Sequence, residues 1–103
     1  MISNIRFALQ RLRPTSSPLC EHVPKVQTPE RRSLACEACE SRGDKWVHLR
    51  MCLSCGQVGC CDSSRNKHAT RHFRDAGHPV MRSVEPGESW IWCYVDERLM
   101  KRR

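Results

Sequence analysis

The pattern of hydrophobic and polar residues predicts three short strands between residues 46 and 95. Residues 46–51 alternate, with Val47, Leu49 and Met51 on one side, which is typical of a half-buried strand. Residues 79–84 and 90–95 are rich in β-branched and aromatic side chains and predict two more strands. The Glu-Pro-Gly-Glu segment at 85–88 has proline and glycine where a tight turn favours them, so these two strands are expected to form a hairpin.

One helix is predicted over residues 65–76. Ser63 or Ser64 is a suitable N-cap, and Gly77 lies where helices commonly end in a left-handed turn. His68 and His72 are four residues apart, so both imidazoles are expected on one face of this helix.

The remaining segments are expected to be irregular. Residues 19–42 contain Pro24 and Pro29 between potential metal ligands and predict loop structure. Residues 1–18 and 98–103 are basic and contain no acid, so we interpret them as flexible N-terminal and C-terminal tails around one domain, residues 19–97.

Composition limits both the core and the partners. A chain of 103 residues with 6% aromatic residues forms at most one domain and cannot build a large apolar core. The net charge of +7 comes from the two tails, whereas the middle of the chain is formally neutral, which argues against nucleic acid as the partner. No segment approaches the roughly 20 apolar residues of a membrane span, and none has the features of a secretory signal. We therefore expect a monomer in the reducing cytoplasm.

The cysteines and histidines point to zinc. Eleven of them have metal-ligand spacings: Cys20, His22, Cys36, Cys39, Cys52, Cys55, Cys60, His68, His72, His78 and Cys93. Each C-x-x-C pair supplies two thiolates to a tetrahedral ion and needs two more ligands from elsewhere. Spacing indicates four extra ligands, one cysteine and three histidines: Cys60, His68, His72 and His78. It does not decide which histidine joins which pair.

A third zinc site would use Cys20, His22 and Cys93 and lacks one ligand. Asp96 follows Cys93 by three residues, as the second cysteine of a C-x-x-C pair follows the first, and carboxylate oxygen is an acceptable zinc donor. Cys61 and water are the alternatives, and water would leave an open site of the catalytic type. The sequence therefore predicts three zinc ions, with two as the minimum.

Metal binding can supply the folding stability that the small apolar core does not provide. Structural zinc contributes about 10–16 kcal/mol of folding free energy in finger peptides, so the metal-free chain is expected to be largely unfolded. The alternative is a secreted domain with four disulfides, but disulfide frameworks do not require histidines at fixed offsets from the cysteines.

These motifs together resemble the UBP-type zinc finger, a ubiquitin-binding domain of deubiquitinases and of a cytoplasmic histone deacetylase. The resemblance runs from Cys20 to about Glu97, and several segments are similar to the short stand-alone prokaryotic members. The matching motifs are Cys20-x-His22, Cys36-x-x-Cys39, Cys52-x-x-Cys55-Gly-Gln-Val-Gly-Cys60, His68-Ala-x-x-His72, Gly77-His78-Pro79 and Trp92-Cys93-Tyr94.

The resemblance implies an α+β fold, in which a small twisted antiparallel sheet packs on one main helix and zinc stabilises the whole. It also implies how the ligands pair. One ion would take Cys36, Cys39, Cys60 and His68, and another would take Cys52, Cys55, His72 and His78. Three-zinc members of the family have a cysteine at the position of Asp96, so the third site departs from the pattern.

The ligand pocket departs from the family as well. Ubiquitin-binding members hold the free carboxylate of the ligand with an arginine and an aromatic platform, and the matching positions here are Asp62 and Arg50. An aspartate repels a carboxylate and cannot donate to it, so ubiquitin binding in the usual mode is not expected. Trp92 and Tyr94 do match the aromatic wall. We therefore expect a non-enzymatic protein-binding module whose pocket, near Arg50, Trp92 and Tyr94, accepts a peptide terminus.

Two other function classes remain as alternatives. A nucleic-acid-binding protein would use the tails and the helical stripe of Lys67, Arg71 and Arg74. An enzyme would be a zinc hydrolase at the incompletely ligated third site, which contains Cys20, His22 and Cys93, or a thiol oxidoreductase that uses C-x-x-C. Zinc coordination would consume the reactive thiolates, and no general base is placed beside an open zinc.

Overall fold

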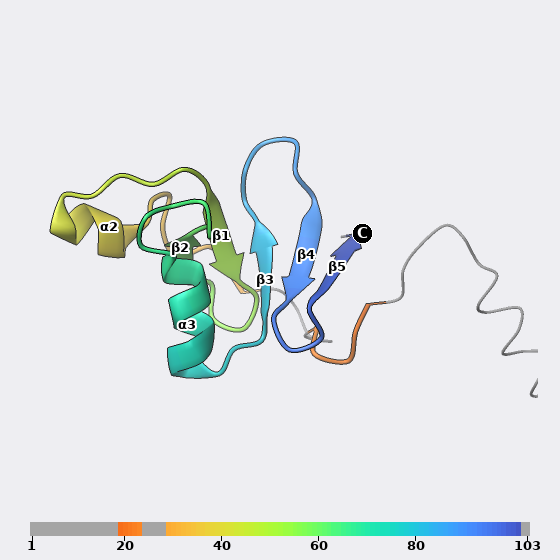
Figure 1. Ribbon diagram of the computed structural model, residues 1–103. Helices are drawn as coiled ribbons and strands as arrows, with labels where there is room; N and C mark the ends of the chain where they lie inside the picture. The colour runs from red at the N-terminus through yellow and green to blue at the C-terminus, as the bar shows by residue number, and fades with distance from the viewer. Residues whose placement is uncertain (1–18, 24–28, 102–103) are drawn as a thin grey trace, which may run out of the picture.

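Five short strands form one antiparallel sheet in the order β2-β1-β3-β4-β5 (Figure 1). The computed structural model describes residues 19–23 and 29–101. The strands are β1 (Leu49–Cys52), β2 (Val58–Cys60), β3 (Val80–Ser83), β4 (Trp90–Cys93) and β5 (Arg98–Lys101). The predicted hairpin is confirmed, because β3 and β4 pair directly through the turn at 85–88.

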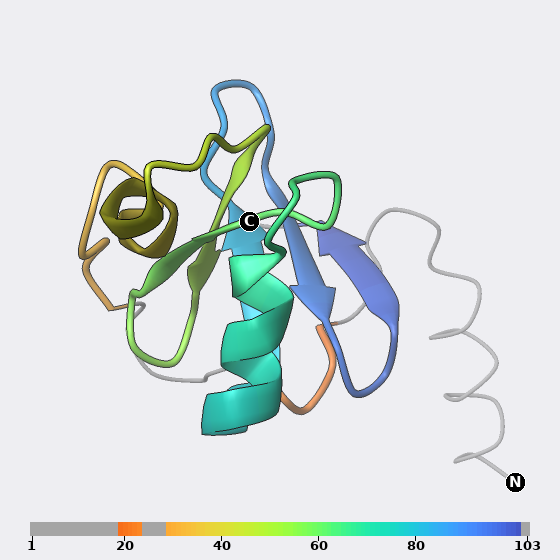
Figure 2. The same ribbon diagram turned by 60° about the vertical axis from the view of Figure 1, so that its left-hand side comes forward.

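Within the part of the chain that the structure describes, two helices accompany the sheet. The main helix, α3 (His68–Ala76), packs against β2 and β1, and the short helix α2 (Glu37–Arg42) contacts β2. Figure 2 shows α3 across one face of the sheet, with α2 to its side. The predicted α+β class, with a twisted antiparallel sheet and one main helix, is confirmed.

Cysteines make up much of the interior. The largest side chains that are completely enclosed are Met100, Val80 and four cysteines, Cys36, Cys39, Cys60 and Cys93. Aliphatic residues of β1 and β4 complete the core. Because so few large apolar groups are buried, hydrophobic burial alone is a weak source of stability, as the composition predicted.

Two predicted elements begin later than expected. The strand predicted over 46–51 begins at Leu49, and Val47, which the alternation put on the same side as Leu49 and Met51, is 54% exposed. The helix predicted over 65–76 begins at His68, and neither serine caps it. Ser64 is buried instead, and its Oγ accepts a hydrogen bond of 2.8 Å from the backbone N–H of Val47. The serine thus ties the entry of β1 to the loop before α3.

Three elements were missed. Helix α2 lies in the segment predicted to be irregular, and β2 was not expected. The predicted C-terminal tail at 98–103 was wrong as far as residue 101, because β5 pairs with β4 and Met100 is only 2% exposed. Leu99 and Met100 are adjacent between basic residues, so the segment has no alternation that would indicate a strand. The predicted N-terminal tail, residues 1–18, lies outside the described residues.

Candidate metal centres and an aromatic hollow

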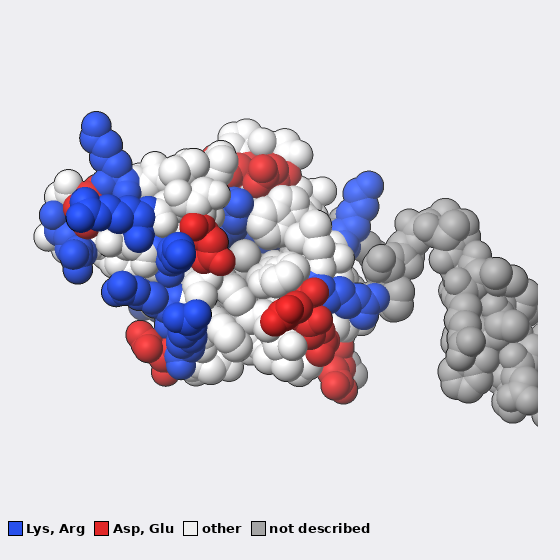
Figure 3. All heavy atoms as spheres, viewed as in Figure 1, with Lys and Arg blue, Asp and Glu red and all other residues white. Residues whose placement is uncertain are grey.

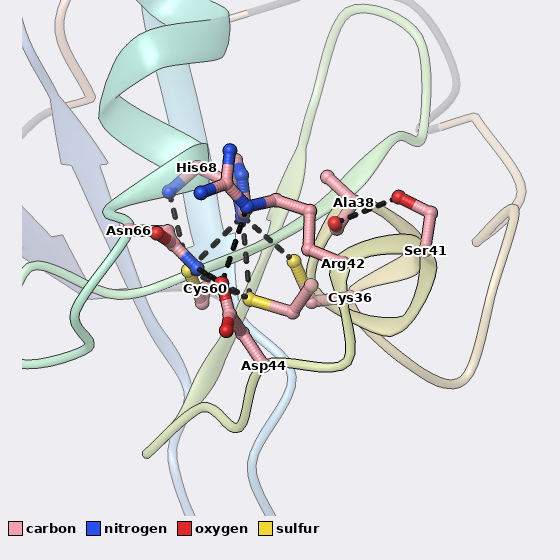
Figure 4. A network of polar contacts seen from close by, with 9 residues as sticks. Cys36, Ala38, Ser41, Arg42, Asp44, Cys60, Asn66 and His68 are labelled. Atoms are coloured by element: carbon pink, nitrogen blue, oxygen red, sulfur yellow. Dashed lines mark hydrogen bonds and ion pairs between the residues drawn. The ribbon is translucent and has the colours of Figure 1, made fainter.

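Helix α2, strand β2 and the start of α3 bring four potential ligands together. This first cluster consists of Cys36, Cys39, Cys60 and His68. The Nδ1 atom of His68 lies 3.3 Å from Sγ of Cys36, 3.4 Å from Sγ of Cys39 and 3.5 Å from Sγ of Cys60. The sulfurs of Cys39 and Cys60 are 3.8 Å apart. In Figure 4, Cys36, Cys60 and His68 point toward one another from these different elements.

These separations suit a tetrahedral zinc ion. With Zn–S near 2.3 Å and Zn–N near 2.0–2.1 Å, the edges of the tetrahedron are about 3.8 Å between sulfurs and about 3.5 Å between sulfur and nitrogen. The first cluster matches both values. Its donor set of three thiolates and one imidazole is also one that structural zinc prefers.

The surroundings of the first cluster support ligation. Asn66 is buried, and its Nδ2 donates to Asp44 Oδ2 at 2.9 Å and lies 3.5 Å from Sγ of Cys39. The backbone N–H of His68 donates to Sγ of Cys60 at 3.2 Å. Such contacts from outside the ligand set orient the donors and stabilise thiolate charge.

Burial disfavours the charged forms of the ligands in this cluster when no cation is present. Burial raises the pKa of the Cys36 thiol to about 11. It lowers the pKa of His68, and the nearby Arg71 lowers it further. The imidazole is therefore held in the neutral form that a metal ligand requires, whereas the thiol needs a cation to become a thiolate.

The second cluster joins the C-x-x-C knuckle after β1 to α3 and the loop that follows it. It consists of Cys52, Cys55, His72 and His78. Sγ of Cys52 lies 3.4 Å from Nδ1 of His78, Sγ of Cys55 lies 3.4 Å from Nε2 of His72, and the two histidine nitrogens are 3.1 Å apart. The pKa of His72 is lowered by burial and then by His78. His68 and His72, which the sequence placed on one helical face, thus join different clusters.

The third cluster ties the segment at 20–22 to the end of β4. Cys20, His22, Cys93 and Asp96 have donor atoms within 4.8 Å of one another. Nδ1 of His22 lies 3.2 Å from Oδ2 of Asp96 and 3.6 Å from Sγ of Cys93. Burial raises the pKa of the Cys20 thiol. This cluster is more open than the other two, because the Asp96 side chain is 37% exposed.

Cys61, the competing ligand, lies elsewhere. Its sulfur is 3.5 Å from Oγ of Ser64, and it belongs to none of the three clusters. Burial raises the pKa of its thiol, but hydrogen bonds with the Ser64 hydroxyl and neighbouring backbone groups outweigh this and bring the pKa to about 7. All eight cysteines are free, so the disulfide framework considered above is absent.

A separate hollow lies over β3, β4 and the loop after β2. Its volume is about 260 Å³. We call it the aromatic hollow, and its lining includes Arg50, Cys61, Asp62, Trp90, Trp92 and Tyr94. The three predicted pocket residues, Arg50, Trp92 and Tyr94, therefore do line one concave site, together with Asp62.

The aromatic side chains of the hollow are held in place by their neighbours. The rings of Trp92 and Tyr94 meet at 88° with centroids 6.4 Å apart, and Phe73 of α3 stacks on Tyr94 at 4.6 Å. The hydroxyl of Thr70 lies 3.4 Å from the hydroxyl of Tyr94. The wall is therefore preorganised by contacts with α3.

Sequence reasoning missed three residues around these sites. Trp90 lines the hollow, and a signal existed, because period-two alternation puts it on the same face as Trp92 and Tyr94. Asn66 and Glu88 act through contacts with residues far away in sequence, and nothing local in the chain indicated them.

Comparisons with known proteins agree with this geometry. A family model described as "Zn-finger in ubiquitin-hydrolases and other protein" matches residues 36–103. The chain is 31% identical to the RING finger protein ETP1 homolog of Schizosaccharomyces pombe over 91% of its length, and 30% identical to ubiquitin carboxyl-terminal hydrolase 44 of Xenopus tropicalis over 74%. It spans only 16% and 12% of those two proteins.

A solved structure is similar as well. The solution NMR structure of protein RPA1320 from Rhodopseudomonas palustris is 49% identical, with a TM-score of 0.75, over 82% of this chain and 83% of that one. Among the described residues, no helix is both long and apolar enough to cross a membrane.

Proposed function

Because the chain belongs to the family of zinc fingers found in ubiquitin hydrolases and other proteins, we propose that it is a non-catalytic, zinc-stabilised module that binds a peptide end in the aromatic hollow. The observation that carries the proposal is the position of the hollow. Its lining residues Arg50, Trp92 and Tyr94 belong to none of the three metal clusters. The hollow is therefore free to bind a partner while the clusters stabilise the fold.

We assign one zinc ion to each cluster. Cys36, Cys39, Cys60 and His68 hold the first, Cys52, Cys55, His72 and His78 the second, and Cys20, His22, Cys93 and Asp96 the third. Zinc supplies positive charge that makes buried thiolates stable and cross-links elements distant in sequence. The donor distances and the free cysteines support this assignment. The eight cysteines form no disulfide, which also supports a reducing, cytoplasmic location.

The donor sets argue against catalysis at zinc. A catalytic zinc keeps one coordination position open, whereas each cluster offers four protein donors. The carboxylate of Asp96 lies 3.2 Å from Nδ1 of His22, which supports it as the fourth donor in place of the water that the hydrolase alternative requires. The thiols of both C-x-x-C motifs lie beside histidine nitrogens, which supports ligation over redox chemistry.

The proposed peptide site differs from that of the family. Asp62 stands where the resemblance expects the arginine that binds a carboxylate, so binding of ubiquitin in the usual mode is not part of the proposal. The small size of the hollow favours a chain end or a single side chain over a large ligand, because sites for drug-sized molecules measure roughly 300–1,000 Å³.

The test is an NMR titration of the zinc-loaded chain with short peptides that have free or blocked ends. We expect saturable shifts confined to resonances of Trp92, Tyr94 and their neighbours. Trp92→Ala should abolish these shifts, and Leu34→Ala is the control, because Leu34 is an exposed hydrophobic residue outside the hollow. If no peptide gives a saturable response, the proposed function is wrong.

Nucleic acid is a second candidate partner, favoured by one observation. Basic residues gather over α2 and α3, whereas uncharged and acidic side chains predominate over β3 and β4 (Figure 3). Lys67, Arg71 and Arg74 are exposed there. This candidate predicts binding whose affinity falls steeply with salt, and a gel-shift series with duplex and single strands at low salt tests it.

A further inference from the structure

We propose that the aromatic hollow binds the ammonium group of a peptide, supplied by an N-terminal amine or a lysine side chain, and not a peptide carboxylate. This inference rests on the proposed peptide-binding function and adds the charge of the group that is recognised. It follows from how the charges around the hollow are paired.

The positive charge of Arg50 is already engaged. Its Nη1 lies 3.5 Å from Oε1 of Glu88 and donates to the carbonyl of Leu49 at 3.1 Å and to Oγ of Ser83 at 3.2 Å. Its guanidinium lies over the ring of Trp90, with Cζ 4.5 Å from the centroid. The Arg50 side chain is only 11% exposed.

Glu88 is fixed in its place by a second contact, since the Ser83 hydroxyl donates to its carboxylate. The opposite charges of Arg50 and Glu88 therefore balance each other. The hydrogen bond from Ser83 holds Glu88 in place, and the cation–π contact with Trp90 holds Arg50. A ligand carboxylate that used Arg50 would have to compete with Glu88 for it.

Asp62 faces the hollow without such compensation. Its Oδ1 accepts one hydrogen bond of 2.6 Å from the Thr70 hydroxyl, and no ion pair involves Asp62 within residues 19–23 and 29–101. With Arg50 and Glu88 balanced, the net charge at the hollow is negative.

The aromatic wall suits the same kind of ligand. A cation is attracted to the faces of tryptophan and tyrosine rings, and the rings of Trp92 and Tyr94, which meet at 88°, both line the hollow. An exposed carboxylate beside such rings adds a direct ionic partner. A hollow of about 260 Å³ has room for an ammonium head and the methylene groups next to it.

The experiment uses the zinc-loaded full chain and one five-residue peptide in five forms. The first has a free amine and an amidated end, and the second is acetylated with a free carboxylate. The other three are blocked at both ends and carry lysine, trimethyl-lysine or norleucine at the centre. We expect saturable shifts at Trp92 and Tyr94 only with forms that carry an ammonium group, and the strongest of these identifies its source.

Three variants make the test specific. Asp62→Asn should weaken ammonium binding about five- to tenfold, the range expected for loss of one partly exposed ionic contact. Glu40→Gln removes the same charge from the exposed face of α2 and should leave the affinity unchanged. Asp62→Arg should abolish ammonium binding and create binding of the carboxylate form.

The outcomes separate the two proposals. If only the carboxylate form binds, or if Asp62→Asn binds ammonium as tightly as the native chain, the ammonium inference is overturned while peptide binding stands. If no form binds to the hollow, the proposed function itself fails.

Discussion

Gly59 of β2 lies directly against Ala69 of α3. A Cβ atom at Gly59 would be 2.7 Å from the backbone nitrogen of Ala69 and 2.9 Å from the carbonyl carbon of His68. Both contacts are with backbone, so no side chain can move aside. Only glycine therefore allows the strand that carries Cys60 and the helix that carries His68 to approach closely enough to form the first cluster.

Gly59→Ala is expected to force these two elements apart. We predict a loss of stability of about 1–3 kcal/mol, the usual cost of overpacking, together with weaker zinc binding at the first cluster. Thermal unfolding and competition with a chromogenic zinc chelator measure the two effects. Gly43→Ala is the control, because its Cβ meets open space and its positive φ should lower stability without loss of zinc. Native zinc affinity in Gly59→Ala would contradict this account.

Removal of the metal is expected to unfold most of the domain. The core contains few large apolar side chains, and four cysteines that are potential ligands are among its most buried residues. We predict that a strong chelator collapses the NMR chemical-shift dispersion and that added zinc restores it. A metal-free sample, verified by elemental analysis, that keeps its dispersion would show that the clusters are not the main source of stability.

Zinc binding is expected to release protons. The pKa of Cys36 in the folded, metal-free state is raised from its ordinary value of 9.0 to about 11. The neutral thiol therefore contributes stability to that state below pH 9, and this contribution is lost as the pH rises towards 11. Zinc requires the thiolate, so loading at pH 7 must displace the proton. Calorimetric titration in two buffers of different ionisation enthalpy should show about one proton released per ligand cysteine.

Acid is expected to weaken zinc binding through the histidines as well as the cysteines. The pKa values of His68 and His72 are below the ordinary 6.5 in the folded chain. Their neutral forms therefore contribute stability above pH 6.5, and this contribution is lost as the pH falls through the lowered values. Zinc content measured after dialysis across this range should fall with decreasing pH. Full retention of zinc well below the histidine range would contradict ligation by these imidazoles.

Asp96 is expected to complete the third site. Asp96→Ala should reduce the zinc count in native mass spectrometry from three to two, because it removes one of four donors from an already exposed cluster. Asp96→Cys keeps a donor at the same position and should retain three. Equal zinc counts in both variants would mean that Asp96 is not a ligand.

The adjacent cysteines 60 and 61 are expected to behave differently. Sγ of Cys60 lies 3.5 Å from Nδ1 of His68, whereas Sγ of Cys61 contacts Ser64 and belongs to no cluster. Cys60→Ser should therefore lose one zinc ion, and Cys61→Ser should keep them all. Because both substitutions exchange sulfur for oxygen at buried positions, each controls for the chemistry of the other. Zinc loss in Cys61→Ser would revise the ligand set.

Local patterns predicted some elements well and others poorly. The hairpin of β3 and β4 is rich in β-branched and aromatic residues and has a Pro-Gly turn, and both strands formed where expected. Strand β5 has one buried methionine among charged residues, and its position depends on pairing with β4, which no local signal reports. Ser64 suggested a helix cap, but a tertiary contact with Val47 took its hydroxyl. The capping preference of Ser64 was therefore overridden by a hydrogen bond to a residue distant in sequence.

The sequence by itself determined the chemistry of this protein. Thiols and imidazoles at knuckle and helical spacings point to zinc whatever the path of the chain, because ligand identity and short-range offsets are local properties. Spacing left open which histidine joins which pair and whether Asp96 or Cys61 completes the third cluster, and the tertiary structure groups these residues as the resemblance and the offset of Asp96 predicted. Only the tertiary structure decided that Glu88 pairs with Arg50, whereas Asp62 has no ion pair among the described residues. These relationships join residues far apart in sequence, such as His22 and Asp96, which are 74 positions apart, and their distances depend on how the whole chain packs.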